Sequence, residues 1–183
     1  EIEYNLYVPT TYDPAKEYPV VLVLHGGGQR TQPTDMILKR YQMATIWAKD
    51  SEAGKNECIV IAPHMVDSWY KMEDVNGSAY PISELSPEGN AAYELLQWVK
   101  ENYSTDNDRI YVTGASMGGM GSLTFGYVHT DEFAAIMPCC AREFINEDVD
   151  YTKYLPLSGK ILYAHAEDDP TCPYSGGEII MDS

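Results

Sequence analysis

Positive charge is scarce in this chain of 183 residues. Twelve lysines and arginines stand against 28 aspartates and glutamates, which gives a formal net charge of −16 at pH 7. A protein that binds the nucleic-acid backbone needs a basic surface, and an anionic membrane also attracts basic proteins. The composition therefore argues against nucleic-acid and membrane partners, and we attribute the acidic excess to solubility.

Long hydrophobic runs and metal-type cysteine patterns are also missing. No apolar run approaches the roughly 18 residues that a membrane-spanning helix needs. Cys58, Cys139, Cys140 and Cys172 match no zinc spacing, so no metal site is predicted. Cys58 is expected in the core. A bridge from Cys139 or Cys140 to Cys172 requires two strand ends to lie side by side, which leaves the redox compartment open.

A starting methionine and a signal-type segment are absent as well, which indicates a processed chain or one taken from a longer protein. The length predicts one domain, residues 1–183, with a sizeable core. Residues 66–86 lack periodicity and are predicted to form a long surface loop. Strands are expected at residues 2–9, 18–28, 57–64, 109–116, 133–140 and 159–166, and helices at 35–50, 87–103 and 117–129. This alternation predicts an α/β fold with a mostly parallel sheet and helices on both faces.

Ser116 stands between a strand-like run and a helix-like run, within Gly114-Ala115-Ser116-Met117-Gly118. A sharp strand-to-helix turn brings the residues two before and two after the serine together, and glycine leaves room there. The hydroxyl would then face the carboxyl edge of the sheet, with the Met117 N–H pointing at the same place. The pattern predicts a nucleophile and one oxyanion-hole donor. The plainer alternative is a glycine-rich turn with an incidental serine.

His25-Gly26-Gly27-Gly28 ends another buried strand-like run. Glycine lets the backbone approach a ligand, so this loop can aim a second N–H at the oxyanion. Gly27 is the preferred donor, and Gly28 remains an alternative. His25 is expected to orient the loop. Acyl-transfer chemistry needs both donors, so the two glycine-rich loops support each other.

Asp168 and Asp169 follow the run at 159–166 directly. An acid at that position could orient a histidine and stabilise its charged form, and Asp169 is preferred over Asp168. The alternative is two solvated acids in a turn.

These stretches together resemble the α/β-hydrolase superfamily, above all its secreted esterase and predicted-peptidase branch, with feruloyl esterases and polyhydroxyalkanoate-depolymerase-like enzymes. Residues 163–173, YAHAEDDPTCP, are similar to an H-G-x-x-D-x-x-V-P segment with Ala166 in place of glycine, and this register carries the family's acid to Asp169. The resemblance implies ester or amide hydrolysis through an acyl-serine, without a cofactor. It also covers residues 4–28, 106–122 and 131–141.

The general base is missing from its expected place. In the α/β-hydrolase order the histidine follows the acid, but only 14 residues follow Asp169 (183 − 169) and none is histidine. The chain is therefore expected to lack the last strand and helix of a full hydrolase. Its exposed sheet edge would favour a homodimer. An unusual base such as His64 and an inactive relative remain alternatives. The four histidines are His25, His64, His129 and His165.

Three functions fit these features. The leading one is a serine carboxylic-ester hydrolase that acts on a small-molecule or polysaccharide-linked ester. Family likeness, together with Trp69 and Tyr70 in the predicted loop, suggests aromatic acyl esters of plant polysaccharide. A serine peptidase of the prolyl-oligopeptidase type would use the same residues, and an inactive binding protein would keep the cleft. The secreted-branch likeness favours export.

Overall fold

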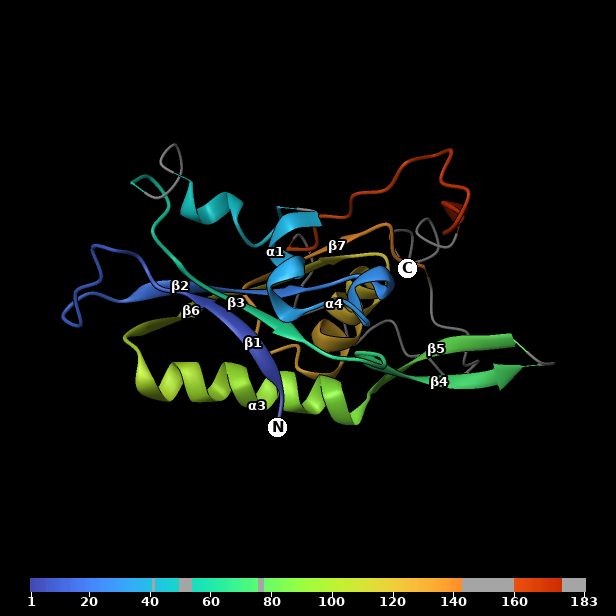
Figure 1. Ribbon diagram of the computed structural model, residues 1–183, viewed down its shortest axis with the longest axis horizontal. Coiled ribbons are helices and arrows are strands. Elements are labelled where there is room, and N and C mark those ends of the chain that lie inside the picture. The colour runs from blue at the N-terminus through green and yellow to red at the C-terminus, as the bar shows by residue number, and fades with distance from the viewer. Residues whose placement is uncertain (41, 50–53, 76–77, 143–159, 176–183) are drawn as a thin grey trace.

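A five-stranded, mostly parallel sheet forms the centre of the molecule (Figure 1). The computed structural model describes residues 1–40, 42–49, 54–75, 78–142 and 160–175. The strand order is β1-β3-β2-β6-β7; β1 runs antiparallel to β3, and the other pairs are parallel. The strands are β1 (Glu3–Tyr7), β2 (Tyr18–Leu24), β3 (Ile59–His64), β6 (Thr105–Ala115) and β7 (Ala135–Cys139).

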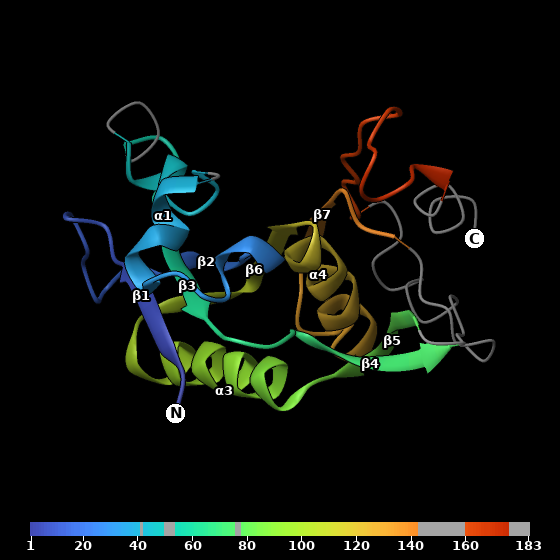
Figure 2. The same ribbon diagram turned by 45° about the vertical axis from the view of Figure 1, so that its right-hand side comes forward.

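Helices cover both faces of this sheet, as predicted. Val20, Leu22 and Leu24 of β2 belong to the larger core, which also contains residues of α3 (Pro87–Asn102) and α4 (Met117–Val128). The alternate residues Val21 and Val23 face the smaller core, which includes Ile37 of α1 (Ile37–Arg40). Figure 2 shows α1 and α3 on opposite sides of the strands. The continuous apolar run thus forms a strand buried on both faces. No described helix has the length and apolar character needed to cross a membrane.

The prediction of one helix over residues 35–50 is wrong. The described part of this segment contains two short 3₁₀ helices, η2 (Thr34–Met36) and η3 (Ile46–Ala48), with α1 directly after η2. Gln42 has a φ of 53°. A residue in this left-handed region cannot continue a right-handed helix, so the helical spacing of the apolar residues is broken there.

The prediction of a surface loop over residues 66–86 is also wrong. β4 (Tyr70–Val75) and β5 (Ser78–Leu85) pair antiparallel as a separate hairpin that projects from the body (Figure 1). The sequence carries a hairpin signal that hydrophobic periodicity does not reveal, the Asn-Gly dipeptide at 76–77. These two residues lie outside the described ranges.

The strand expected at residues 159–166 is reduced, in its described part, to two isolated parallel bridges with β7, Ile136 with Ile161 and Cys139 with Ala164. Residue 159 lies outside the described ranges. Backbone hydrogen bonds support both bridges: the Leu162 N–H donates to the Ile136 carbonyl (3.0 Å), and the Cys140 N–H donates to the Ala164 carbonyl (2.8 Å). The turn after residue 166 is thereby held beside the end of β7.

The first turn of α4 lies directly on the ends of β2 and β7, because glycines remove the side chains in between. A Cβ added to Gly118 would lie 2.0 Å from the Leu24 carbonyl oxygen, and one added to Gly114 would lie 2.5 Å from the same oxygen. A Cβ on Gly119 would lie 2.2 Å from the Cys139 carbonyl oxygen. No other residue type fits these positions without moving the backbone. The spacing of glycines around Ser116 therefore has a steric cause.

We predict that Gly118→Ala lowers the free energy of unfolding by about 3 kcal/mol or more, because overpacking against the Leu24 carbonyl requires the backbone to move. This loss exceeds the roughly 1 kcal/mol that alanine gains over glycine inside a helix. Urea denaturation followed by circular dichroism measures the change. Gly54→Ala is the matched control, since no atom lies within 4 Å of a Cβ added there. Equal stability of the two variants would contradict the steric account.

Candidate active site

Ser116 occupies a sharp turn between β6 and α4, with φ 58° and ψ −119°. This conformation is uncommon for a residue that carries a Cβ. Hydrogen bonds hold it in place: its N–H donates to the Cys139 carbonyl (3.0 Å), and its carbonyl accepts from the Met120 N–H (2.9 Å). The Cys140 sulfur lies 3.2 Å from the same Ser116 nitrogen. The structure therefore contains the bend that the sequence predicted.

The loop after β2 contacts the beginning of α4. Gly27 begins the 3₁₀ helix η1 (Gly27–Gln29), and a Cβ added to it would lie 3.9 Å from the Met117 sulfur. The Gly27 carbonyl accepts from the Arg30 Nε (3.2 Å). The N–H groups in the first turn of a helix have no acceptor within that helix. The structure thus brings Gly27 and Met117, the two predicted donor residues, next to each other.

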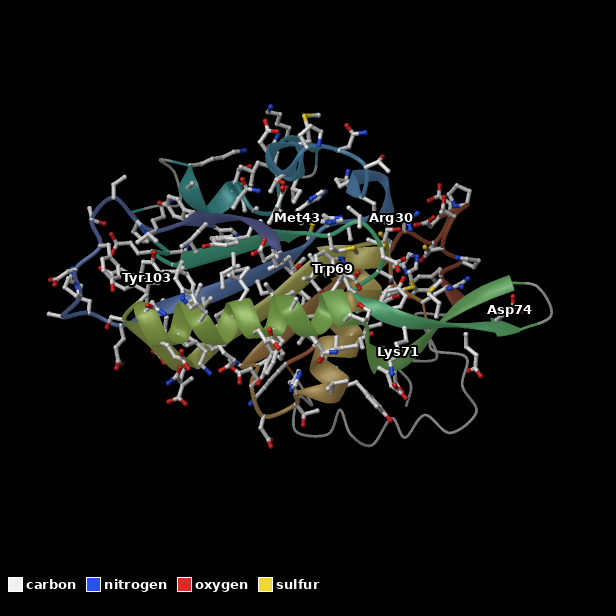
Figure 3. The ribbon with its side chains drawn as sticks, turned by 60° about the horizontal axis from the view of Figure 1, so that its bottom comes forward. Arg30, Met43, Trp69, Lys71, Asp74 and Tyr103 are labelled. Atoms are coloured by element: carbon white, nitrogen blue, oxygen red, sulfur yellow. The ribbon has the colours of Figure 1, made fainter. Side chains whose placement is uncertain are left out.

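His25 organises this loop from the interior, where it is 3% exposed. Its Nε2 accepts from the Met65 N–H (3.2 Å), so the ring proton is on Nδ1, which donates to the Gly26 carbonyl (2.8 Å). The indole N–H of Trp69, labelled in Figure 3, donates to the His25 carbonyl (2.9 Å). Burial lowers the pKa of His25 to about 4, so the ring is neutral at physiological pH.

Asp169 holds a tight turn together. Its Oδ1 accepts from the backbone N–H groups of Thr171 (2.8 Å) and Cys172 (2.9 Å). These two hydrogen bonds, with a smaller contribution from His165, lower the pKa of the Asp169 carboxyl. The other oxygen, Oδ2, lies 3.7 Å from the His165 Nε2. Asp168, the alternative acid, is exposed.

Cys172 joins Ser116 to the Asp169 turn. The Cys172 thiol interacts electrostatically with the Ser116 side chain, and the Cys172 N–H donates to the Asp169 carboxylate (2.9 Å). Cys172 is buried, with 6% of its surface exposed. The sequence analysis considered Cys172 only as a possible bridge partner of Cys139 or Cys140 and did not place it beside Ser116. Through Cys172 the Asp169 turn lies at Ser116, on the edge of the sheet where the loops meet.

No hydrogen bond joins a histidine ring to Ser116 in the part of the chain that the structure describes. His64, the alternative base, has its Nε2 3.1 Å from the Gln29 carbonyl and its Nδ1 3.8 Å from the Glu3 carboxylate. His129 stacks on Tyr93 with a ring separation of 3.7 Å. The Nε2 of His165 lies 2.7 Å from the Cys172 carbonyl.

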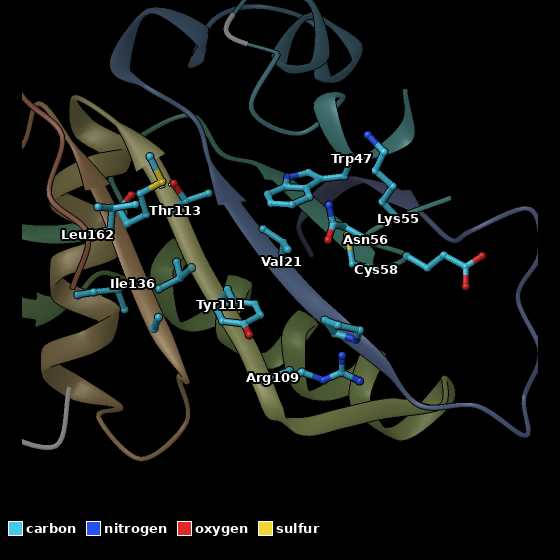
Figure 4. A pocket seen from close by; sticks show the side chains of 15 residues that line it. Val21, Trp47, Lys55, Asn56, Cys58, Arg109, Tyr111, Thr113, Ile136 and Leu162 are labelled. Atoms are coloured by element: carbon cyan, nitrogen blue, oxygen red, sulfur yellow. Dashed lines mark hydrogen bonds between the residues drawn. The ribbon is translucent and has the colours of Figure 1, made fainter. Parts of the chain in front are cut away.

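A cavity of about 510 Å³ lies elsewhere, on the sheet face that carries the smaller core (Figure 4). Ser116, Gly27, Met117 and Asp169 do not line it, so this cavity is not the candidate site. Within the described ranges, no group of three or more His, Cys, Asp or Glu side chains is placed to hold a metal ion. The lining of the 510 Å³ cavity includes Val21, Trp47, Cys58, Tyr111, Thr113, Ile136 and Leu162.

Solved esterases share this fold. A thermostable esterase is 28% identical, with a TM-score of 0.85 over 99% of this chain and 47% of its own, so the chain spans about half of that protein. A feruloyl esterase module from Clostridium thermocellum, complexed with sinapinate, is 15% identical, with a TM-score of 0.66 over 98% of this chain and 66% of its own. A ferulic acid esterase from Anaeromyces mucronatus, in complex with ferulic acid, is 20% identical, with a TM-score of 0.57 over 98% of this chain and 72% of its own.

A family model matches most of the chain. The Esterase model, described as "Putative esterase", matches residues 1–141. This range contains Gly27, Ser116 and Met117, and it ends before the turn that holds Asp169. With the mostly parallel sheet and its two helical layers, the match identifies the chain as a member of the Esterase family with the α/β-hydrolase fold.

Proposed function

We propose that this chain carries the nucleophile of a carboxylic-ester hydrolase and that Ser116 forms the acyl intermediate. The observation that supports this most strongly is the turn at Ser116, where a left-handed φ of 58° places the serine directly before Met117, the residue that lies next to Gly27. Buried serines in ordinary turns do not require such a conformation. Strain of this kind persists where the surrounding structure enforces it, and it is concentrated at functional sites.

In the proposed reaction the Ser116 oxygen attacks the carbonyl carbon of the ester. The negative charge that develops on the carbonyl oxygen is stabilised by the N–H groups of Gly27 and Met117, and the loss of one such donor typically costs about 10² to 10³ in rate. The alcohol leaves, and water then hydrolyses the acyl-serine. The His25 ring supports the proposed oxyanion loop from the interior, since it is hydrogen-bonded to the Gly26 carbonyl and the Met65 N–H.

Asp169 is the proposed acid of the triad. Its carboxylate is ionised at neutral pH, because the backbone hydrogen bonds of its own turn lower its pKa. A negative charge here would orient a histidine and stabilise the charged ring. In the described structure none of the four histidine rings is hydrogen-bonded to Ser116, so we assign the general base to none of them.

The proposed substrate is an ester of an aromatic acid. The Anaeromyces and Clostridium structures contain ferulic acid and sinapinate, two such acids. The sequence suggested Trp69 and Tyr70 as aromatic contacts for this group. They are 0% and 2% exposed and belong to the larger core, so we assign them to packing.

Ser116 should react covalently with a fluorophosphonate probe, and Ser116→Ala should abolish the label. Added imidazole should speed the reaction on the order of tenfold or more, because it replaces a base that usually contributes at least that much. Mass spectrometry of the labelled peptide identifies the site and its rate of modification.

Ser122→Ala is the control for this experiment. Ser122 lies in the same helix, and its hydroxyl bonds to the Gly118 carbonyl (2.8 Å). This variant should keep the label. An unlabelled Ser116 in folded protein, with imidazole present, would refute the proposed nucleophile. Feruloyl and acetyl esters of the same alcohol then test the acyl group, and faster acylation by the acetyl ester would refute the aromatic preference.

The neutral His25 predicts acid sensitivity. Because the pKa in the folded state is about 4 and the ordinary value is 6.5, the unfolded chain takes up this proton first. The contribution of the neutral His25 ring to the free energy of unfolding is complete above pH 6.5 and is lost as the pH falls towards 4. Between pH 7 and pH 5 the loss should be about 2 kcal/mol.

His25→Gln removes this titration and is the matched comparison. We expect the free energy of unfolding of the natural chain to fall about 2 kcal/mol further than that of the variant between pH 7 and pH 5. Urea denaturation at a series of pH values measures how the free energy of unfolding of each protein changes with pH, and this slope is compared between the two. Identical slopes would show that His25 does not carry the acid sensitivity.

A further inference from the structure

Two cysteines contact Ser116 from different segments of the chain. The Cys140 sulfur, directly after β7, lies 3.2 Å from the Ser116 nitrogen. The Cys172 thiol, in the Asp169 turn, interacts electrostatically with both Ser116 and Cys140. Both are free thiols. Side-chain contacts also join the Cys172 backbone to the residue after Cys140: the Cys172 carbonyl lies 2.7 Å from the His165 ring, which contacts the Tyr163 hydroxyl, and this hydroxyl donates to the Ala141 carbonyl. The two thiols therefore lie in neighbouring segments beside Ser116.

The backbone holds these two segments together independently of the thiols. The Cys140 N–H donates to the Ala164 carbonyl (2.8 Å), and Cys139 forms a parallel bridge with Ala164. The Cys172 N–H is bound by Asp169 (2.9 Å). The condition that the sequence set for a bridge, two strand ends side by side, is therefore met.

Cys140 is the better partner of the two neighbouring cysteines. The Cys139 sulfur lies 3.9 Å from the Met137 carbonyl, and its contact with Ser116 is made by the backbone carbonyl alone. The fourth cysteine, Cys58, belongs to the smaller core, on the sheet face opposite the larger core.

We propose that Cys140 and Cys172 are a redox-active dithiol that closes into a disulfide beside Ser116, with a low-molecular-weight disulfide such as glutathione disulfide as the oxidant. One thiolate attacks glutathione disulfide and releases one glutathione. The second thiolate attacks the mixed disulfide, forms the Cys140–Cys172 bond and releases the second glutathione. The protein loses two electrons and two protons, and the oxidant is reduced to two thiols.

The bridge would change what surrounds the nucleophile. The Ser116 hydroxyl loses the Cys172 thiol with which it interacts, and the two joined sulfurs would stand between Ser116 and the Asp169 turn. The turn itself stays intact, because the Ser116 N–H keeps its bond to the Cys139 carbonyl (3.0 Å). The disulfide thus slows acylation without unfolding the site. This consequence depends on the proposed function, whereas formation of the bond does not.

The charges around the two thiols set the conditions of the test. Burial raises the pKa of both, and the Asp169 carboxylate raises them further. Hydrogen bonds from Ser116 oppose this for both thiols, as does Arg142 for Cys172. Both groups are therefore protonated near neutral pH, and oxidation is faster in alkaline buffer.

The full chain is incubated with glutathione disulfide at about pH 9, near the ordinary pKa of a thiol. Free thiols are then alkylated, and the protein is mapped without reduction. We expect a peptide pair that links Cys140 with Cys172, in the natural chain and in the control Cys139→Ser. Neither Cys140→Ser nor Cys172→Ser should form it. A map without this pair, or with Cys139 joined to Cys172, would overturn the proposal.

Probe labelling of Ser116 is measured on the same samples. Oxidation should slow labelling at least tenfold in the natural chain and in Cys139→Ser, and dithiothreitol should restore it. Cys140→Ser and Cys172→Ser should label equally with and without oxidant. Unchanged labelling of the bridged protein would overturn the regulatory role. A reduced chain that never labels at Ser116 would instead refute the proposed function, and the peptide map would still decide whether the dithiol exists.

Discussion

The close approach of the Gly118 backbone to the Leu24 carbonyl is the constraint on which the rest of the site depends. A Cβ at Gly118 would lie 2.0 Å from that oxygen, so α4 can begin on the end of β2 only with glycine there. This placement leaves a single residue, Ser116, to reverse the chain, and its φ of 58° follows. Strain of about 1 to 3 kcal/mol is typical of such a residue. The hydrogen bonds of Ser116 to β7 and α4 offset it.

The parts of the fold that the sequence predicted are those whose pattern is local. Residues 18–24 and 58–63 are continuous apolar runs because β2 and β3 are buried on both faces, and α3 and α4 have continuous helical spacing. The segment 35–50 has the same spacing, but Gln42 adopts a left-handed φ that apolar periodicity does not encode. The hairpin β4–β5 was missed for a related reason: the Asn-Gly dipeptide in the sequence between the two strands, and not hydrophobic periodicity, carries the signal.

The candidate site likewise contains features with a local sequence pattern and features without one. The bend at Ser116 and the approach of the Gly27 loop to Met117 could be predicted because glycine spacing reports a backbone turn directly. The roles of Cys140 and Cys172 could not, because they depend on two segments about 30 residues apart meeting at one serine. For His25 the role in the loop was predicted, but its partners Met65 and Trp69, 40 and 44 residues further along the chain, were not. Contacts of this kind are set by the tertiary fold. The sequence can mark a polar residue as a candidate, but it does not identify the residue that it contacts.

The most direct test of the central claim is a crystal structure of the chain with a phosphonate bound covalently to Ser116. The account predicts a phosphorus–oxygen bond at the Ser116 hydroxyl, and a phosphoryl oxygen about 2.7 to 3.1 Å from the backbone nitrogens of both Gly27 and Met117. A phosphoryl oxygen that points away from these two nitrogens, or an adduct on another residue, would contradict it.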